Sequence, residues 1–340
     1  MRSHVSENPP IGLSRADDQT IEETVNGPLH IKFSFVIPTY NEEHDVAETL
    51  EALLAIDYPD KEIIVVDDST DSTPEIVRSY SEKGVLLFRP EKRAGRCEAR
   101  NIGIREATGD VVVILNADVR LKADFLNRLF LHYEQGYDYV LVRSKVSNTE
   151  SLWARYVGSR SEWEYAVDPS ANEWTEGFSC RKRVAIEAGL FPSGFPIQIC
   201  AGEDRVFGGN LRKAGAKMKL DLSIMVEHLA PDSFRTYWQI RKERLKGGPQ
   251  VRFFVEGWSL GMLVGWAILR IAQSAALVLP LVPLILIARK TCRYSPYGGE
   301  DTLPFMWAWL VERTAFHVGE WEGIMEIARV QRRKRKSECL

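Results

Sequence analysis

The stretch VVVILNADVR, residues 111–120, is an apolar run that ends abruptly in Asn116-Ala117-Asp118. Side chains along a strand alternate between the two faces of a sheet, so residues 116 and 118 would point the same way. Both polar side chains would then emerge together at the carboxyl edge of the sheet, where open α/β sheets hold their ligands. For this fragment alone, a strand followed by an ordinary Asn/Asp turn is the simpler interpretation.

The segments around this run alternate between strand and helix patterns. Short apolar runs predict strands at 33–39, 62–69, 85–89, 111–118, 139–146 and 218–226. Helical spacing and capping residues predict helices at 42–54, from 73 onward, and at 98–107, 185–189 and 204–214. This alternation is typical of a wound α/β layer. Because parallel strands end at the same edge of such a sheet, four polar residues should converge there: Asp67, Asp68, Asn116 and Asp118.

The charge of the chain is distributed unevenly. Residues 241–340 contain 16 Lys and Arg against 9 Asp and Glu, whereas residues 1–240 contain 28 against 38. A basic final third suits an anionic membrane or a nucleic acid. The sequence has no zinc-type cysteine spacing, RNA-binding motif or helix-turn-helix pattern, so we expect no nucleic-acid partner.

Cysteine usage and the N-terminus bear on the compartment. The five cysteines are scattered and odd in number, which is typical of reduced thiols in the cytosol. The first twenty residues, MRSHVSENPPIGLSRADDQT, lack the apolar core of a secretory signal. Residues 1–30 are therefore predicted to form a polar, loosely held arm.

The most apolar stretch of the chain is 271–288, in which only Gln273 and Ser274 are polar. As a helix it would span about 27 Å, against about 30 Å for the core of a bilayer. Pro280 and Pro283 should kink such a helix. A buried core helix is the alternative interpretation of this stretch.

A second segment, 303–316, is rich in tryptophan but carries Glu312 and Arg313, so it suits an amphipathic helix in the membrane interface. Basic residues flank the apolar stretch on both sides and fill the tail at 329–340. The positive-inside rule assigns all of them to the cytosolic face. We therefore expect residues 251–328 to form a helical region that enters or lies in the membrane without a stable single span, and that could also pack against a second copy in a homodimer.

Five motifs recur in a fixed order along the chain: FVIPTYNEE (35–43), IIVVDDSTD (63–71), AGRCEARNIGI (94–104), VVILNADV (112–119) and GEDRVFGGNLRKAG (202–215). In this order and spacing they resemble family 2 glycosyltransferases of the GT-A fold. The resemblance extends over residues 33–246. It implies an α/β fold in which residues 31–250 form the catalytic domain, a wound mixed sheet flanked by helices.

The resemblance also implies an activity. Such an enzyme would be inverting and non-processive, and would move a sugar, with mannose or glucose favoured, from a GDP- or UDP-sugar to a lipid-linked acceptor at the cytosolic membrane face. Processive polymerases carry a Gln-x-x-Arg-Trp motif, whereas here Gln239 is followed by Arg241, Arg244 and Leu245 without the tryptophan. Arg241 or Arg244 could still neutralise the diphosphate leaving group.

Loops after the strands usually hold the nucleotide in this family. The resemblance carries this role to Pro38, Tyr40, Glu42, Asp68, Arg93, Arg96, Asn116 and Ala117. Asp68 is favoured over Asp67, and Glu42 could instead be an acidic residue that favours a helix start. Arg93, Arg96 and Arg100 lie in the segment that usually contacts the nucleotide in this family, and guanidinium groups suit phosphates. At least one of the three is expected to be a solvated charge without this role.

Asn116-Ala117-Asp118 stands where the family has its Asp-x-Asp motif. The resemblance implies that this motif holds Mg²⁺ or Mn²⁺, ions that prefer oxygen ligands and share the donor's phosphates. Asp118 is the predicted direct ligand. The amide of Asn116 brings no charge, which puts the metal affinity in question. His228 is either a second metal ligand or a structural histidine.

Inverting sugar transfer needs a carboxylate that takes the proton of the acceptor hydroxyl. Gly202-Glu203-Asp204 resembles the family's acidic motif, with Asp204 as the predicted base and Glu203 as its rival. Glu176 and Gly177 belong to a loop that resembles the one beneath the donor sugar.

Two other classes of protein compete with this interpretation. Asn116 motivates the first, a degenerate transferase fold that binds nucleotide without turnover. The second, a nucleotidyltransferase, would more often show a glycine-rich phosphate loop after the first strand, and IPTYNEE (37–43) contains no glycine.

Overall fold

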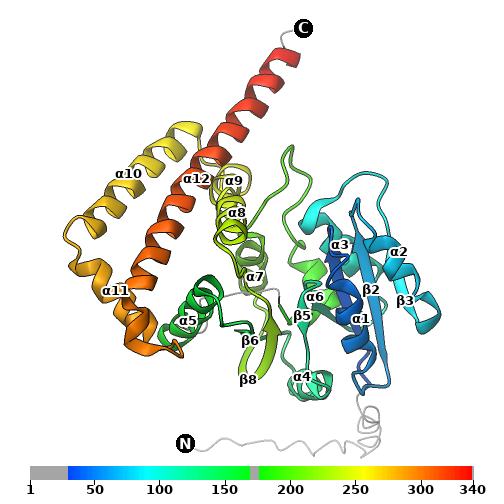
Figure 1. Cartoon of the computed structure of the whole chain (residues 1–340). Coiled ribbons are helices and arrows are strands. Elements are labelled where there is room, and N and C mark those ends of the chain that lie inside the picture. Colours follow the sequence, from blue (N-terminus) through cyan, green and yellow to red (C-terminus); the bar gives the residue numbers. More distant parts are fainter. Residues whose placement is uncertain (1–29, 169–175, 339–340) are drawn as a thin grey trace, which may run out of the picture. The chain divides into compact units, whose positions relative to one another are not determined.

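The computed structural model describes residues 30–168 and 176–338. The chain divides into two units, Met1–His30 and Ile31–Leu340. The predicted N-terminal arm lies outside the described residues apart from His30. The second unit contains the sheet and the helices discussed below (Figure 1).

An eight-stranded mixed sheet forms the centre of the second unit. The strands are β1 (Phe33–Thr39), β2 (Lys61–Asp67), β3 (Val85–Phe88), β4 (Val111–Ile114), β5 (Val119–Arg120), β6 (Tyr139–Val146), β7 (Phe178–Arg181) and β8 (Met218–His228). Their order across the sheet is β3-β2-β1-β4-β7-β6-β8-β5. The first four pair in parallel, β7 is antiparallel to both neighbours, and β8 is parallel to β6 but antiparallel to β5. The predicted wound α/β fold with a mixed sheet is thus confirmed.

Helices cover both faces of this sheet. They are α1 (Val46–Leu54), α2 (Thr73–Arg78), α3 (Gly95–Glu106), α4 (Phe125–Glu134), α6 (Lys182–Glu187) and α7 (Glu203–Lys213). β1 sends Phe33, Phe35 and Ile37 into a core shared with α1 and α4, and Val36 into a second core shared with α3, α6 and α7. Gly103 of α3 permits a close approach, since a Cβ there would lie 2.3 Å from Val36 Cγ1.

The carboxyl end of β4 differs from the prediction. The strand stops at Ile114, so Asn116 and Asp118 lie in the following turn, and strand alternation does not explain their placement. Their placement follows from the order of the strands. Chain connections leave β1 and β4 in opposite directions across the sheet, which makes this point a topological switch where α/β sheets hold ligands.

The C-terminal region is helical. Its helices are α8 (Phe234–Leu245), α9 (Gly247–Phe254), α10 (Leu260–Val278), α11 (Val282–Cys292) and α12 (Thr302–Glu338), and they pack with α5 (Leu152–Val167) from the middle of the chain. Short 3-10 turns lie at Ser81–Lys83 and Gly298–Asp301. The predicted kink at the prolines is confirmed as a break: α10 ends at Val278, and Leu281 takes a positive φ of 56° just before α11 begins.

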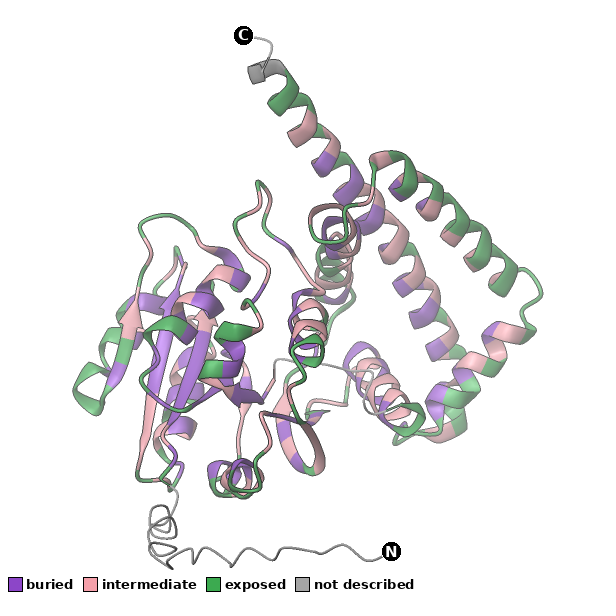
Figure 2. Cartoon of the chain, turned by 180° about the vertical axis from the view of Figure 1, so that it is seen from behind, coloured by how far each residue is buried: buried purple, intermediate pink, exposed green. Residues whose placement is uncertain are grey.

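α10 is long and apolar enough to cross a membrane, judged by length and composition alone, and no other helix of the described residues is. Only Leu263 and Ala267 of this helix are buried. Figure 2 shows the exposed side of α10. Large apolar side chains are exposed on α10, on α11 and on the link between them: Met262, Ile268, Leu269, Ile271, Leu277, Leu279, Leu281, Val282 and Leu286. So wide an exposed apolar surface is typical of a region that binds a membrane or another protein.

α12 includes the segment that was expected to lie in the membrane interface, but one of its charges points inward. Glu312 is 6% exposed and accepts a hydrogen bond of 2.9 Å from the Tyr156 hydroxyl. It also pairs with Arg160 of α5, and its Oε1 lies 3.8 Å from Arg241 Nε of α8. The charge that argued against a membrane span therefore holds three helices of the protein together.

Two glycines allow α12 to cross α8 closely. A Cβ at Gly319 would lie 2.3 Å from the Lys242 carbonyl oxygen, and one at Gly323 would lie 2.8 Å from that of Lys246. Lys242 and Lys246 also pair with Glu322 of α12 at 3.2 Å each. Small residues and ion pairs thus fix α12 against the helix that carries Arg244.

Gly319→Ala should destabilise the protein, because the Lys242 carbonyl that blocks the new methyl group belongs to a helix backbone. Overpacking of this kind costs about 1–3 kcal/mol. Gly265→Ala in α10 is the matched control, since nothing lies within 4 Å of its Cβ position and alanine favours a helix. Thermal unfolding should show a lower Tm for the first variant only. Equal Tm values for both would mean that α8 and α12 are not in this close contact.

Candidate active site

A cavity of about 540 Å³ lies at the switch point of the sheet. Its walls come from the loops after β1, β2 and β4, from α3, from the loop before α7 and from α8. The lining residues are Pro38, Thr39, Tyr40, Glu42, Asp68, Arg93, Gly95, Arg96, Ala99, Arg100, Asn116, Ala117, Asp118, Gln198, Ile199, Cys200, Gln239, Ile240, Glu243 and Arg244. Ten predicted site residues are among them: Pro38, Tyr40, Glu42, Asp68, Arg93, Arg96, Asn116, Ala117, Asp118 and Arg244.

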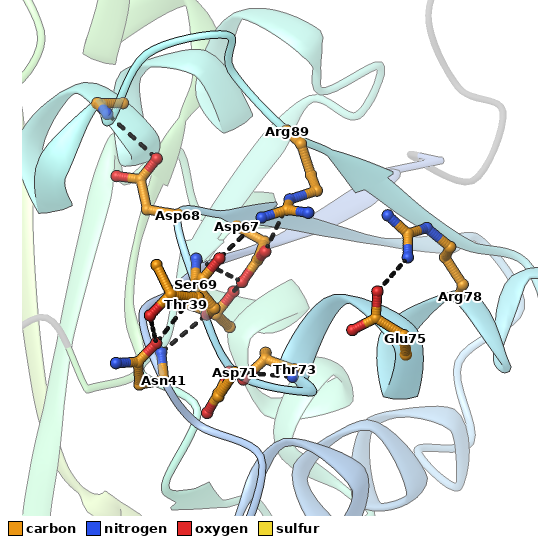
Figure 3. Close-up of polar contacts among 12 residues, drawn as sticks. Thr39, Asn41, Asp67, Asp68, Ser69, Asp71, Thr73, Glu75, Arg78 and Arg89 are labelled. Carbon is orange, nitrogen blue, oxygen red and sulfur yellow. Dashed lines mark hydrogen bonds and ion pairs between the residues drawn. The ribbon is translucent and has the colours of Figure 1, made fainter.

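The loop after β1 is held by the end of β2 (Figure 3). Asn41 takes a positive φ of 59°, donates its backbone N–H to Ser69 Oγ at 2.8 Å, and accepts from Thr70 N at 2.9 Å. Asparagine tolerates this left-handed conformation better than most residues. The turn places Tyr40 and Glu42 at the cavity.

The two aspartates after β2 have different surroundings. Asp67 is buried, accepts from Thr39 Oγ1 at 2.8 Å and pairs with Arg89 at 3.1 Å, so it binds the strand ends together and does not converge on the cavity as predicted (Figure 3). Asp68 lines the cavity and accepts from the backbone N–H groups of Ala94 and Gly95 at 3.1 and 2.6 Å. It thereby holds the start of α3, which carries two of the site's arginines.

The three arginines of the α3 region have three different environments. The Arg93 guanidinium lies over the Tyr40 ring, 3.9 Å from its centroid. Arg96 is half-exposed in the cavity, and its Nη1 lies 3.8 Å from Glu203 Oε1. Arg100 is 2% exposed, and its Nη1 donates to the same oxygen at 2.7 Å. Arg93 and Arg96 are therefore available to an anion in the cavity, whereas Arg100 mainly orders the side chains around it.

Acidic groups gather opposite the arginines. Burial and the nearby Asp118 raise the pKa of Glu42 to about 7. Burial and Glu176 raise the pKa of Asp118, against the opposing effect of His228 and Arg244. Burial is the main cause of both shifts, and a neighbouring carboxylate adds to each of them.

The residues present fit a divalent cation that a nucleotide in the cavity would help to coordinate. Asp118 Oδ1 and Glu176 Oε2 are buried and make no hydrogen bond within the described residues. His228 Nδ1 shares a hydrogen bond of 2.9 Å with Ser144 Oγ, which leaves Nε2 as the nitrogen for a ligand. The residues described include no group of three or more His, Cys, Asp or Glu that could hold a metal without further ligands.

The two acidic residues at the start of α7, Glu203 and Asp204, have pKa values shifted in opposite directions. Gly202, at φ 87°, precedes the helix, and Glu203 and Asp204 form its first turn. Although burial favours its neutral form, Arg100 and Arg96 hold the pKa of Glu203 below its usual value. Burial and the charge of Glu203 raise the pKa of Asp204 to about 6. A carboxylate with a pKa near neutrality is suited to accept a proton, which favours Asp204 over Glu203 as the base.

Six predicted residues do not line the cavity: Glu176, Gly177, Glu203, Asp204, His228 and Arg241. Glu176 and Glu203 are each hydrogen-bonded to a residue that lines the cavity. Glu176 accepts from Asn116, and Glu203 accepts from Arg100. Gly177 lies behind the wall, where a Cβ would meet Val226 Cγ2 at 2.6 Å. Arg241 turns toward α12, which leaves Arg244 as the arginine of α8 that faces the cavity.

The sequence pointed to Arg100 together with Arg93 and Arg96, but its burial was not predicted. Arg100 occupies the same helical face as the buried Cys97 and Ile104, and a charge on an apolar stripe could have marked it as a buried partner. Other lining residues were absent from the sequence prediction. Gln198 and Cys200 lie in a loop without periodicity, so no signal pointed to them. Gln250, fully buried, accepts from Cys200 N at 2.9 Å and fixes that loop.

A second cavity of about 930 Å³ adjoins the first. It lies between residues 90–98 and 192–199, and it shares Arg93, Gly95, Arg96, Gln198 and Ile199 with the first cavity. Phe195 and Ile197 are on its apolar side, and the Phe195 ring stacks on Phe254 of α9 at 5.2 Å. The second cavity thus connects the site with the apolar cluster that α9, α10 and α12 form.

Comparisons with known proteins agree with this geometry. Residues 34–184 match the family model "Glycosyl transferase family 2". A poly-beta-1,6-N-acetyl-D-glucosamine synthase of Staphylococcus epidermidis is 37% identical over 93 residues, 27% of this chain and 23% of its own length. The Staphylococcus aureus (strain COL) protein of the same name is 25% identical over 234 residues, 64% of this chain and 55% of its own length. The chain therefore matches about half or less of the length of these curated relatives.

A solved structure supports the fold. The mannosyltransferase from Pyrobaculum calidifontis, determined in complex with GDP-Man and Mn²⁺, superposes with a TM-score of 0.52 at 22% identity, over 84% of this chain and 88% of that one. The mixed sheet, the cavity at its switch point and the family match lead to one assignment. Residues 34–184 are similar to glycosyltransferases of family 2, and the mixed sheet that contains them is consistent with the GT-A fold.

Proposed function

We propose that this protein is an inverting, non-processive glycosyltransferase that moves a hexose from a nucleotide-sugar to a lipid-linked acceptor. The observation that carries the proposal is the cavity at the switch point, where Arg93, Arg96 and Arg244 face Glu42 and Asp118. A nucleoside diphosphate needs cations for its phosphates, and a metal that accompanies it needs carboxylate oxygens. The cavity supplies both.

The metal in this proposal is Mg²⁺ or Mn²⁺. Asp118 would hold it, with His228 and Glu176 nearby and the donor's phosphates completing the coordination. Asp118 Oδ1 and Glu176 Oε2, which are buried and make no hydrogen bond within the described residues, support this assignment, and Mn²⁺ accompanies GDP-Man in the mannosyltransferase from Pyrobaculum calidifontis. When bound, the ion would neutralise charge on the leaving diphosphate.

The protein's own groups divide the remaining work. Asp204 takes the proton of the acceptor hydroxyl as that oxygen attacks the anomeric carbon, so one displacement inverts the configuration. Arg244, and Arg96 beside it, stabilise the negative charge that develops on the departing diphosphate. Arg100 keeps Glu203 ionised next to the base.

The acceptor in this proposal carries an apolar chain. The second cavity leads from the site toward α9 and α10 past Phe195, and α10 exposes a wide apolar surface. Lys92 and Arg96 on the same cavity would suit a phosphate at the head of the chain. We further propose that the α10–α11 region attaches the protein to the cytosolic face of a membrane.

The donor is tested by thermal shift with a panel of ligands: GDP, UDP, GDP-mannose, UDP-glucose and UDP-N-acetylglucosamine, each with Mn²⁺. At least one nucleotide and its sugar derivative should raise Tm. A ligand that binds only the folded protein stabilises it by about 2.7 kcal/mol when its concentration is 100 times its Kd. If none of the five changes Tm at millimolar concentration, the cavity is not a donor site.

The pH dependence of the reaction follows from the raised pKa of Asp204. The base acts when ionised, so kcat/KM should rise with pH up to about 6 and level off above it. Because Glu42 also titrates near neutrality in the free protein, the acidic limb is assigned by Asp204→Asn, in which it should disappear. The measurement is a pH–rate profile of both proteins. If the acidic limb is unchanged in the variant, a group other than Asp204 causes it.

The membrane arrangement is tested by cysteine accessibility. In a protein without its native cysteines, a thiol placed at Ser337 should react with an impermeant reagent from the cytosolic side of intact vesicles, because the region enters the membrane without a single span. Labelling from the opposite side only would contradict this arrangement. A thiol at Ser81, in the catalytic domain, is the matched control for the cytosolic side.

A further inference from the structure

Asn116, the residue that departs from the family motif, lies between two charged groups. Its Nδ2 donates to Glu176 Oε1 at 3.1 Å, and its Oδ1 faces Arg100 Nη2 at 3.5 Å. These partners decide how the amide points, because an ionised carboxylate only accepts hydrogen bonds and a guanidinium only donates them. An amide serves both partners at once, which a carboxylate at the same position does not.

Arg100 extends this contact to the helix that carries the base. Its Nη1 donates to Glu203 Oε1 at 2.7 Å, and the two side chains are only 2% and 3% exposed. Glu203 and Asp204 share the first turn of α7. Glu176, Asn116, Arg100 and Glu203 therefore form a row that runs from the loop before β7 to the start of α7.

We propose that Asn116 is a positioning residue, which joins the Glu176 loop to the Glu203–Asp204 turn through Arg100, and that this role requires a neutral amide. The inference rests on the proposed function for its effect on turnover, whereas the link itself concerns the protein without ligands. It removes the main reason to regard the site as degenerate, because the asparagine has a task of its own.

An aspartate at this position would restore the family's motif and yet break the row. It would place a carboxylate directly against the Glu176 carboxylate, two residues from Asp118. Like charges in contact repel each other strongly when water is scarce. Asn116→Asp should therefore lower Tm by about 2 °C or more in the ligand-free protein. It should also lower kcat about tenfold, the size of the coupling within one hydrogen-bond network, while KM for the donor changes little.

The decisive variant exchanges the two groups. In Asn116→Asp/Glu176→Gln an amide again faces a carboxylate, and the new carboxylate also faces Arg100. The double variant should regain most of the Tm lost in Asn116→Asp, and Glu176→Gln alone completes the cycle. Asn210→Asp, an amide-to-carboxylate change in α7 away from the cavity, is the control for the added charge alone.

Two results would overturn the proposal: an Asn116→Asp protein that is as stable and as fast as the wild type, or a double variant no more stable than Asn116→Asp. A merely structural asparagine would alter Tm without the selective fall in kcat. Should the wild type consume no nucleotide-sugar, the proposed function fails, but the Tm cycle still tests the link. The two failures are thus distinguishable.

Discussion

Asp204→Asn is expected to bind the nucleotide-sugar donor as tightly as the wild type and to lose about 100-fold or more in turnover, the scale of general-base catalysis. The asparagine keeps the shape of the side chain, and its Oδ1 can still accept from Arg205 N as Asp204 does at 2.8 Å. The asparagine cannot take a proton. In the wild type, the pKa of about 6 makes Asp204, of the two carboxylates Glu203 and Asp204, the one that combines basicity with ionisation at neutral pH.

Donor affinity by calorimetry and turnover by release of nucleoside diphosphate separate the two effects. Asp124→Asn at the exposed start of α4 is the matched control and should keep full activity. Near-normal turnover in Asp204→Asn would pass the role to Glu203 or to another group.

Asp118→Ala should abolish metal-dependent binding of the donor and leave the ligand-free protein at least as stable as the wild type. The stability follows from linkage: a carboxyl whose pKa is raised in the folded state opposes folding wherever it is ionised, which is at every pH above its unfolded pKa. Removing the group removes that penalty at pH 7. A charge that opposes folding is expected at a residue whose role is to bind a metal.

The measurement is a calorimetric titration of Mn²⁺ in the presence of GDP or UDP, together with Tm of the ligand-free variant. Asp124→Ala provides the control for the loss of a carboxylate elsewhere. Unchanged Mn²⁺ affinity in Asp118→Ala would refute Asp118 as the metal ligand.

Much of the strand and helix pattern of the first 230 residues could be predicted because most of its elements have a local signal, whereas α4, α5, β5 and β7 were not predicted. β1 and β6 have the predicted bounds, since each is an apolar run with clear ends. α5 was missed although Ser151 caps it, because charged and aromatic residues alternate along it without one apolar face. It is stabilised by Glu312, more than 150 positions away, and a partner so distant leaves no local pattern.

The candidate site was predictable where the family motif specifies a residue and not where the fold rearranges neighbours. Arg241 and Arg244 belong to one motif, yet only Arg244 reaches the cavity, because Glu312 of α12 draws Arg241 away. Asp67 and Asp68 are adjacent, yet Thr39 and Arg89 retain the first in the sheet. In each case the decision rests on a side chain that is remote in sequence.

The measurement that tests the central claim most directly is the release of nucleoside diphosphate from the donor that best stabilises the protein. Wild-type protein with Mn²⁺ and vesicles that contain a polyprenyl phosphate should release diphosphate and form a glycosylated lipid in equal amounts, and Asp204→Asn should do so at least about 100 times more slowly. A wild type that binds the donor but consumes none of it, with or without vesicles, would contradict the claim and identify the protein as a nucleotide-binding relative without turnover.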